Sequence, residues 1–170
     1  TTACFEPSLD YVVAKVPRWD LKKFSRVADS LGSSMKSVGE VMAIGRSFEE
    51  VIQKAVRMVD PSLTGFDSMA LDKKDVKSYK QSDDIDSQLR NPTSLRLFAV
   101  ARALEQGYSV DRLHGLTRID NWFLCKLKNI IDMTKTLNSL DSVHRISKED
   151  MRGLKCRGFS DAHIAKNLGN

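Results

Sequence analysis

The stretch MKSVGEVMAIGR, residues 35–46, is the most informative part of this sequence. It holds two glycines and one carboxylate among small and apolar residues, and a capped helix follows it at once. The alternation over residues 35–44 predicts a β-strand. One face of this strand is expected to carry Val38, Glu40, Met42 and Ile44. The other face is expected to carry Met35, Ser37, Gly39, Val41 and Ala43.

Glu40 is the best single candidate for a functional residue. If its strand is buried, an ionised carboxylate on an apolar face costs several kcal/mol unless it is paired. Such a group is retained when it has a partner or when it lines a wet cavity. Two interpretations therefore stay open for Glu40, an ion pair with another part of a larger domain and a place on a cavity wall.

The first 46 residues are expected to form strands and turns. Residues 10–16 predict a strand that ends at Pro17, and its near-continuous apolarity favours cover on both faces. Residues 20–31 predict a polar connection with a helical turn around Phe24 and Val27. Two or three strands do not make an independent sheet with a covered face. This segment is therefore expected to be the end of a larger domain.

Helices are predicted for most of the rest. Ser47 and Glu50 form a capping box that opens an amphipathic helix, which Asp60-Pro61 ends. Residues 61–92 are polar and predict a linker. After Asn91-Pro92, expected as a helix start, the chain predicts one helix over residues 95–106, a short one capped by Ser109 and a long one over residues 119–140. Two more are expected after the caps Ser147 and Ser160. The predicted fold class is mainly α, with a small α+β segment first.

Composition sets limits on function. The chain has 170 residues, of which 41% are hydrophobic and 29% charged, and no apolar run is long enough to span a membrane. Residues 93–170 carry thirteen Lys or Arg and eight Asp or Glu, so the net charge of +5 lies there. This excess favours a solvated surface over nucleic-acid binding. The three widely spaced cysteines are expected to be reduced and mostly buried, in a cytosolic protein.

No catalytic or metal constellation is found in the sequence. His114, His144 and His163 are far apart and are expected at the surface or at helix caps. Glycine-rich phosphate-binding loops and nucleophile elbows are missing too. Phe123 is expected in the core stripe of its helix, with the adjacent Trp122 packed beside it or anchoring a partner. Residues 158–169 are similar to the entry of a helix-turn-helix, so DNA binding stays an alternative.

Several runs of this chain resemble a known family. Residues 5–11 (FEPSLDY), 15–19 (KVPRW) and 35–46 look like the end of the first ATP-grasp unit, the carboxyphosphate-forming one, of the large part of carbamoyl-phosphate synthetase. Residues 107–113, 116–120, 122–124 and 158–161 resemble its all-helical oligomerisation domain. Residues 68–90 match neither part. The form that looks most similar is the cytosolic pyrimidine-pathway one, which is fused to aspartate transcarbamoylase and dihydroorotase.

The resemblance implies a function. The family makes carbamoyl phosphate from bicarbonate, glutamine-derived ammonia and two ATP, with Mg²⁺ and K⁺, and no ATP-binding or metal-binding residue of the family maps onto this chain. The stretch matching residues 35–43 lies beside the ammonia passage in the family. The resemblance therefore makes Met35, Val38, Glu40 and Ala43 expected lining residues, with Glu40 the strongest.

The resemblance also implies a division of the chain. Residues 1–60 are expected to complete the ATP-grasp domain, residues 61–92 to link, and residues 93–170 to form the helical oligomerisation domain. The expected partners are both ATP-grasp units, the glutaminase part and a second copy of the protein, with no nucleic acid and no membrane. The segment alone is expected to bind no cofactor and to be inactive, in the cytoplasm. A freestanding helical interaction module remains the other alternative.

Overall fold

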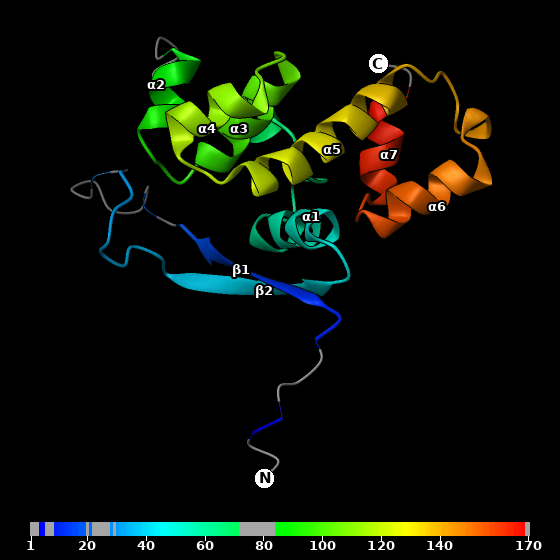
Figure 1. The fold of residues 1–170 in the computed structure, drawn as a ribbon. Helices are drawn as coiled ribbons and strands as arrows, with labels where there is room; N and C mark the ends of the chain where they lie inside the picture. Colours follow the sequence, from blue (N-terminus) through cyan, green and yellow to red (C-terminus); the bar gives the residue numbers. More distant parts are fainter. Residues whose placement is uncertain are drawn as a thin grey trace.

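The computed structural model describes residues 4–5, 9–19, 21, 28, 30–71 and 84–168. A two-stranded sheet lies on one side of helix α1, and the other helices lie on the opposite side (Figure 1). The strands are β1 (Val12–Arg18) and β2 (Gly39–Gly45). The helices are α1 (Phe48–Val59), α2 (Ile85–Arg90), α3 (Arg96–Glu105), α4 (Val110–Thr117), α5 (Asn121–Asn138), α6 (Lys148–Cys156) and α7 (Asp161–Asn167), with short 3-10 turns at Met69–Leu71 and Val143–Arg145. The predicted fold class, mainly helical with a small β-containing segment first, is confirmed.

The two strands pair antiparallel, from Val12 opposite Gly45 to Arg18 opposite Gly39. The prediction that Pro17 ends the first strand is wrong, because Pro17 lies within β1 opposite Glu40. The described part of the sheet gives β1 a single neighbour. A proline is tolerated on such an edge strand, where its missing N–H removes no ladder bond on the open side.

Helix α1 covers one face of the sheet. Ala43 of β2 packs against Val51 and Ala55 of α1, and partly buried side chains from both strands surround them: Val12, Ala14, Val16 and Val41. On the opposite face Val13, Met42 and Ile44 are exposed. Cover on both faces was expected from the apolarity of β1, and the described residues supply it on one face. The alternation of the two faces along β2 is as predicted.

The main core lies among helices α1 to α7 on the other side of α1. Its fully buried members include Phe66, Leu89, Leu113, Leu124 and Ile130. Figure 1 shows α5 running across the molecule and joining the α2–α4 group to the α6–α7 pair. Burial of this many apolar side chains is the dominant stabilising contribution of the fold.

Helix α2 was not predicted, because residues 61–92 were expected to be a linker. Asn91 forms the C-cap of α2 instead of the start of the next helix, and α3 begins at Arg96 without a side-chain cap. The Arg96 guanidinium donates to the carbonyls of Leu89, at 2.9 Å, and Thr117, at 2.7 Å. Arg96 thereby satisfies the carbonyl ends of both α2 and α4.

The four serine caps are confirmed. Each hydroxyl accepts the backbone N–H three residues further on: Ser47 from Glu50, Ser109 from Arg112, Ser147 from Asp150 and Ser160 from His163. These bonds satisfy donors that the first helical turn leaves without a partner. The start of a serine-capped helix is therefore well predicted from this sequence, unlike the starts of α2 and α3.

Other expectations have mixed outcomes. The helical turn around Phe24 and Val27, and residues 72–83 of the connection, lie outside the described residues. Cys125 and Cys156 are free thiols as expected, but Cys4, Cys125 and Cys156 are all exposed rather than buried. Over the described helices, none combines the length and the apolarity that crossing a membrane requires.

Candidate functional site

Glu40 lies on the open face of the sheet. Its Oε1 atom is 3.1 Å from Nζ of Lys15 on β1, and the two side chains are 56% and 60% exposed. The carboxylate therefore has an ion-pair partner within this chain. A pair this exposed contributes little to stability, because water and salt screen it. Its face also presents the exposed apolar side chains Met42 and Ile44.

The four residues expected along the ammonia passage do not share one surface. Met35 and Val38, just before β2, are exposed, at 90% and 55%. Glu40 follows them on the open face of the sheet. Ala43 is 2% exposed and packs beneath α1 on the opposite face. Because side chains alternate along a strand, Glu40 and Ala43 face opposite ways. Ala43 therefore packs between β2 and α1 and does not lie on the open face of the sheet.

Two hydrogen bonds and a close contact join β2 to α1 at the corner between them. The backbone N–H of Arg46 donates to Oε2 of Glu50 at 2.7 Å, and Nζ of Lys54 donates to the carbonyl of Ile44 at 3.0 Å. Hydrogen bonding from Lys54, and then from the Arg46 N–H, lowers the pKa of Glu50. A Cβ atom on Gly45 would lie 2.6 Å from Glu50 Oε2. A side chain at this position would have to displace the Glu50 carboxylate and Val51, so Gly45 favours the close contact between β2 and α1.

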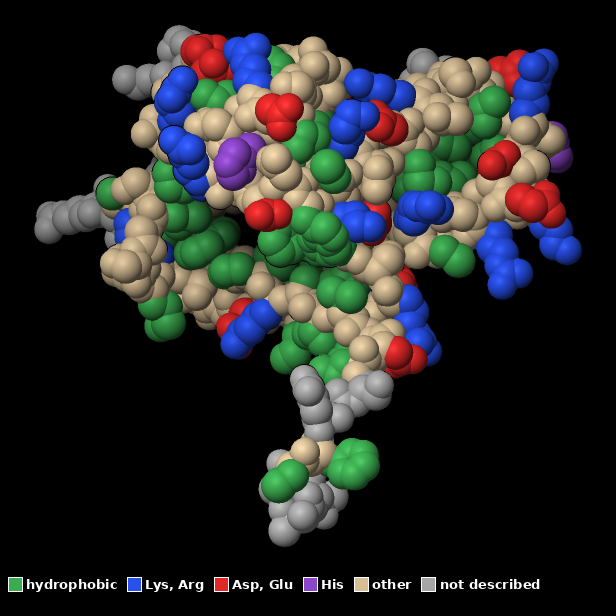
Figure 2. Space-filling model, viewed as in Figure 1, with side chains coloured by type: hydrophobic (Ala, Val, Ile, Leu, Met, Phe, Trp, Pro, Cys, Tyr) green, Lys and Arg blue, Asp and Glu red, His purple; other side chains and the backbone are tan. Residues whose placement is uncertain are grey.

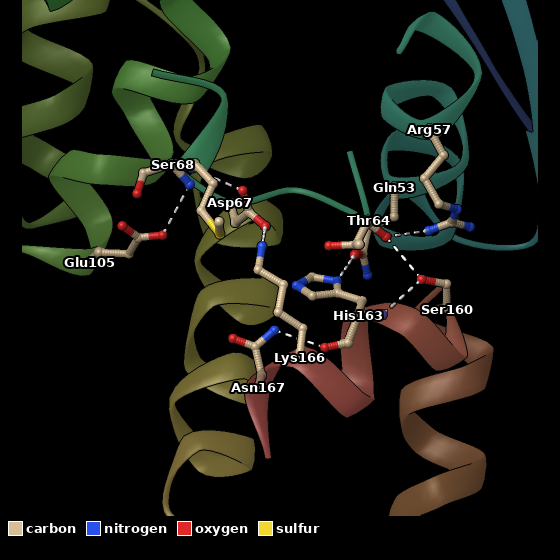
Figure 3. A network of polar contacts seen from close by, with 11 residues as sticks. Gln53, Arg57, Thr64, Asp67, Ser68, Glu105, Ser160, His163, Lys166 and Asn167 are labelled. Carbon is tan, nitrogen blue, oxygen red and sulfur yellow. Dashed lines mark hydrogen bonds and ion pairs between the residues drawn. The ribbon is translucent and has the colours of Figure 1, made fainter. Parts of the chain in front are cut away.

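A polar cluster joins α1 to α7, with Gln53 and His163 buried and its other members half-buried. We call it the α1–α7 joint: Gln53, Arg57, Thr64, Ser160 and His163 (Figure 3). Nε2 of Gln53 donates to the carbonyl of Arg157 at 2.8 Å, which fixes the orientation of the amide. Oε1 of Gln53 then faces Nδ1 of His163 at 3.2 Å. An amide oxygen accepts and does not donate, so His163 carries its proton on Nδ1.

His163 is fully buried, so the expectation of a surface or cap histidine is wrong for it. Its ring stacks on Phe159, with ring centroids 5.0 Å apart. Burial lowers the pKa of His163 to about 4, Lys166 and Arg57 also lower it, and Asp67 opposes them. In the described part of the chain its Nε2 atom has no hydrogen-bond partner. A spacing of four from Phe159, with Ile164 adjacent, is the sequence signal that indicates this burial.

Two further hydrogen bonds of the joint lie next to the Gln53–His163 pair. Nη1 of Arg57 donates to the carbonyl of Gly158 at 2.8 Å, and Oγ of Ser160 donates to the carbonyl of Thr64 at 3.0 Å. Figure 3 shows these groups converging from α1, from the loop after it and from α7. Nearby, Nζ of Lys166 lies 2.8 Å from Oδ2 of Asp67.

Two glycines permit this close packing. A Cβ atom on Gly65 would lie 2.3 Å from Nδ1 of His163 and 2.6 Å from Oε1 of Gln53. A Cβ atom on Gly158 would lie 2.8 Å from the carbonyl oxygen of Glu50, and Gly158 has φ of +83°. The backbone after α6 therefore rests directly on the backbone of α1, in a conformation that favours glycine.

The aromatic residues form a second contact, between α1 and α5. Phe48 packs edge-on against Trp122 and Phe123, with ring centroids 5.7 and 5.3 Å apart. Trp122 packs within the chain, as one of the two interpretations expected, although it is 53% exposed. Phe123 was expected in the core and is 43% exposed, because Leu124 takes the core position. Figure 2 shows hydrophobic side chains gathered where α1 meets the start of α5.

Beside these rings lies a buried carboxylate. Glu49 is 4% exposed and accepts from Nδ2 of Asn129 at 3.0 Å, with Nζ of Lys126 at 3.6 Å. A buried charge needs such partners. Helix α1 is therefore held by the sheet, by α5 and by α7.

The other two histidines follow their expectation. Nδ1 of His114 lies 2.8 Å from the carbonyl of Ile119, just past the end of α4, and His144 is exposed. In the described ranges, no group of three or more His, Cys, Asp or Glu side chains could hold a metal ion.

Comparison with known proteins gives a consistent family. Residues 40–170 match the model of the carbamoyl-phosphate synthetase large chain, oligomerisation domain. The chain is 54% identical over 170 residues to the mitochondrial arginine-specific carbamoyl phosphate synthase large chain of Schizosaccharomyces pombe, covering 99% of this chain and 14% of that protein. It is 51% identical over 170 residues to the multifunctional protein pyr1-3 of Dictyostelium discoideum, covering 99% and 7%.

A third relative is the mitochondrial carbamoyl-phosphate synthase [ammonia] of Rattus norvegicus, 50% identical over 169 residues, with 99% of this chain and 11% of the rat protein covered. The chain thus spans 14% or less of the length of these three relatives.

Proposed function

The chain belongs to the family of the carbamoyl-phosphate synthetase large chain, in its oligomerisation domain, and we propose on this premise that it serves as a domain-joining scaffold within a complete synthetase. It is homologous to an ATP-dependent ligase. The complete enzyme would make carbamoyl phosphate from bicarbonate, glutamine-derived ammonia and two ATP. The match over residues 40–170 is the observation that carries the proposal.

In the complete enzyme this chain would supply the scaffold, and its partners would bind the substrates. ATP, Mg²⁺ and K⁺ would bind in the ATP-grasp units on either side, because the resemblance places none of the family's ATP-binding or metal-binding residues in this chain. The partners would be those units, the glutaminase part and a second copy of the protein. The coding sequence tests this directly. An ATP-grasp unit on each side of residues 1–170 is expected, and a gene that ends within a few residues of this segment would favour the freestanding interaction module.

The division into residues 1–60, 61–92 and 93–170 remains a proposal. The support for it is the resemblance of residues 5–19 and 35–46 to the end of the ATP-grasp unit and of residues 107–161 to the oligomerisation domain. The family model begins at Glu40, within β2, so the match itself spans the strand–helix corner.

We also propose that the open face of the sheet lies against the ammonia passage of the complete enzyme. Of the four expected lining residues, Glu40 has the side chain best suited to bind ammonia, because a carboxylate accepts a hydrogen bond from neutral ammonia. Met35 and Val38 extend the same accessible stretch, and Ala43 backs it from the α1 side. The exposed apolar residues Met42 and Ile44 would exclude water once the rest of the domain covers them.

Glu40→Ala in the complete synthetase tests the passage. Glutamine hydrolysis is expected to continue while less of its ammonia reaches carbamoyl phosphate. Activity with high external ammonia is expected to fall less than glutamine-dependent activity. Lys15→Ala, which removes the ion-pair partner of Glu40, is the matched control for loss of the pair alone. An unchanged ratio of glutamine consumed to product formed in Glu40→Ala would exclude Glu40 from the passage.

The pathway is a finer proposal. The support for the pyrimidine form is the resemblance of Tyr108, Val110 and the run TRID at residues 117–120 to that form. The identity of this chain to the two kinds of relative is nearly equal, at 54% for the arginine-specific chain and 51% for pyr1-3. A cytoplasmic location would follow from the pyrimidine form, whereas two of the relatives are named mitochondrial. A fused aspartate transcarbamoylase in the same reading frame is the deciding observation.

A further inference from the structure

The α1–α7 joint and the hydrogen-bonded β2–α1 corner lie on the same helix. The corner fixes β2 to α1 through Glu50, Lys54 and the close contact at Gly45. The joint fixes α1 to α7 through Gln53 and Arg57. These α1 residues, from Glu50 to Arg57, lie within seven positions of one another, so motion of one contact is transmitted to the other along about two helical turns.

The joint is polar and its bonds depend on geometry. An apolar contact tolerates sliding and rotation, whereas a chain of hydrogen bonds from the Arg157 carbonyl through Gln53 to His163 is formed at one rotation of α1. Both members of the Gln53–His163 pair are fully buried, so water cannot replace a lost partner. The rotation of α1 about its axis is therefore fixed here.

We propose that Gln53 and His163 are positioning residues, which set the orientation of the β1–β2 sheet relative to the helical domain through α1. Helix α1 is the main packing partner of both strands among the described elements. The sheet, with Glu40 on its open face, turns with α1 as one unit. The helical domain thus sets the orientation of the two strands and of the open face of the sheet.

Hydrogen exchange on the 170-residue chain tests the proposal without reference to activity. Gln53→Leu is expected to raise exchange of the amides of β1, β2 and α1 by about tenfold more than exchange of the amides of α3 and α5. Gly65→Ala, which places a methyl group against the same pair, is expected to give the same pattern. Leu137→Ala, in the buried C-terminal part of α5, is the control and should raise exchange in α5 more than in the sheet.

A double variant tests whether the pair itself is responsible. Gln53→Leu leaves His163 without its partner, whereas Gln53→Leu combined with His163→Phe removes both polar groups. The double variant is expected to recover most of the overall stability, because neither member of the pair is left as an unpaired buried polar group. The sheet amides are expected to stay fast-exchanging, because an apolar contact does not fix the rotation of α1. Equal acceleration of all regions in Gln53→Leu, or a sheet that exchanges as in the unchanged chain, would overturn the proposal. Additive losses in the double variant would show that the two residues act separately.

A second arm uses the complete synthetase and rests on the proposed function. Gln53→Leu is expected to raise the ratio of glutamine consumed to carbamoyl phosphate formed, while Leu137→Ala leaves this ratio unchanged. If Glu40→Ala also leaves the ratio unchanged, the passage proposal fails and the exchange result alone decides the positioning role. If Glu40→Ala changes the ratio and Gln53→Leu does not, the positioning residues do not act on the passage.

Discussion

Acidification should selectively destabilise the chain through His163. Its pKa falls from an ordinary 6.5 to about 4 on folding, mainly because burial disfavours the charged ring. The folded state thus binds the proton more weakly than the unfolded state, so the contribution of His163 is fully present above pH 6.5 and is lost as pH falls toward 4. Linkage gives a loss of about 2 kcal/mol between pH 7 and pH 5, approaching about 3 kcal/mol below pH 4.

Urea unfolding of the 170-residue chain at pH 7, 6 and 5 measures this loss. His163→Gln is the comparison, because it cannot titrate and shares every other ionisable group, including Asp67, Lys166 and Arg57 near the ring. The unchanged chain is expected to lose about 2 kcal/mol more than the variant between pH 7 and pH 5. Parallel losses would refute the argument. A nuclear magnetic resonance titration of His163 that gives a pKa above 6 would refute it independently.

Three further results are expected. Gly115→Ala in α4, where a Cβ atom has open space, should raise the free energy of unfolding by about 1 kcal/mol in urea titrations, and a decrease would contradict the packing. Arg118→Gly, at the left-handed C-cap with φ of +61°, should raise it by roughly 0.5 to 1 kcal/mol in thermal unfolding. The isolated chain should form no carbamoyl phosphate with ammonia, bicarbonate and MgATP, and detectable product would disprove the scaffold role.

Helix starts could be predicted because their signals are local. Ser47, Ser109, Ser147 and Ser160 each lie three residues before the N–H that they accept, so a short window of sequence contains the whole motif. Helix α2 was missed because its local signal is too weak. Its six residues complete fewer than two turns, which is too short for an apolar period to show.

The features that were not predicted depend on distant partners. His163 is buried because Gln53, 110 residues earlier in the chain, supplies its hydrogen bond. The alternation along β2 was predictable, but α1 alone decides that Ala43 is covered and Glu40 is open. Phe123 packs on Phe48 from another helix. Local sequence specifies which side chains share a face, and tertiary contact decides which face is buried.

Helix α1 also sets where this region can be exchanged between relatives. A chimaera joined just after Asp60 would combine α1 of one parent with Phe159 and His163 of the other, so the α1–α7 joint would be assembled from unmatched halves. A junction before β1 would keep the strands, α1 and their helical contacts together. The segment that can be inherited as one piece therefore includes the two strands, although the fold class of the domain is helical.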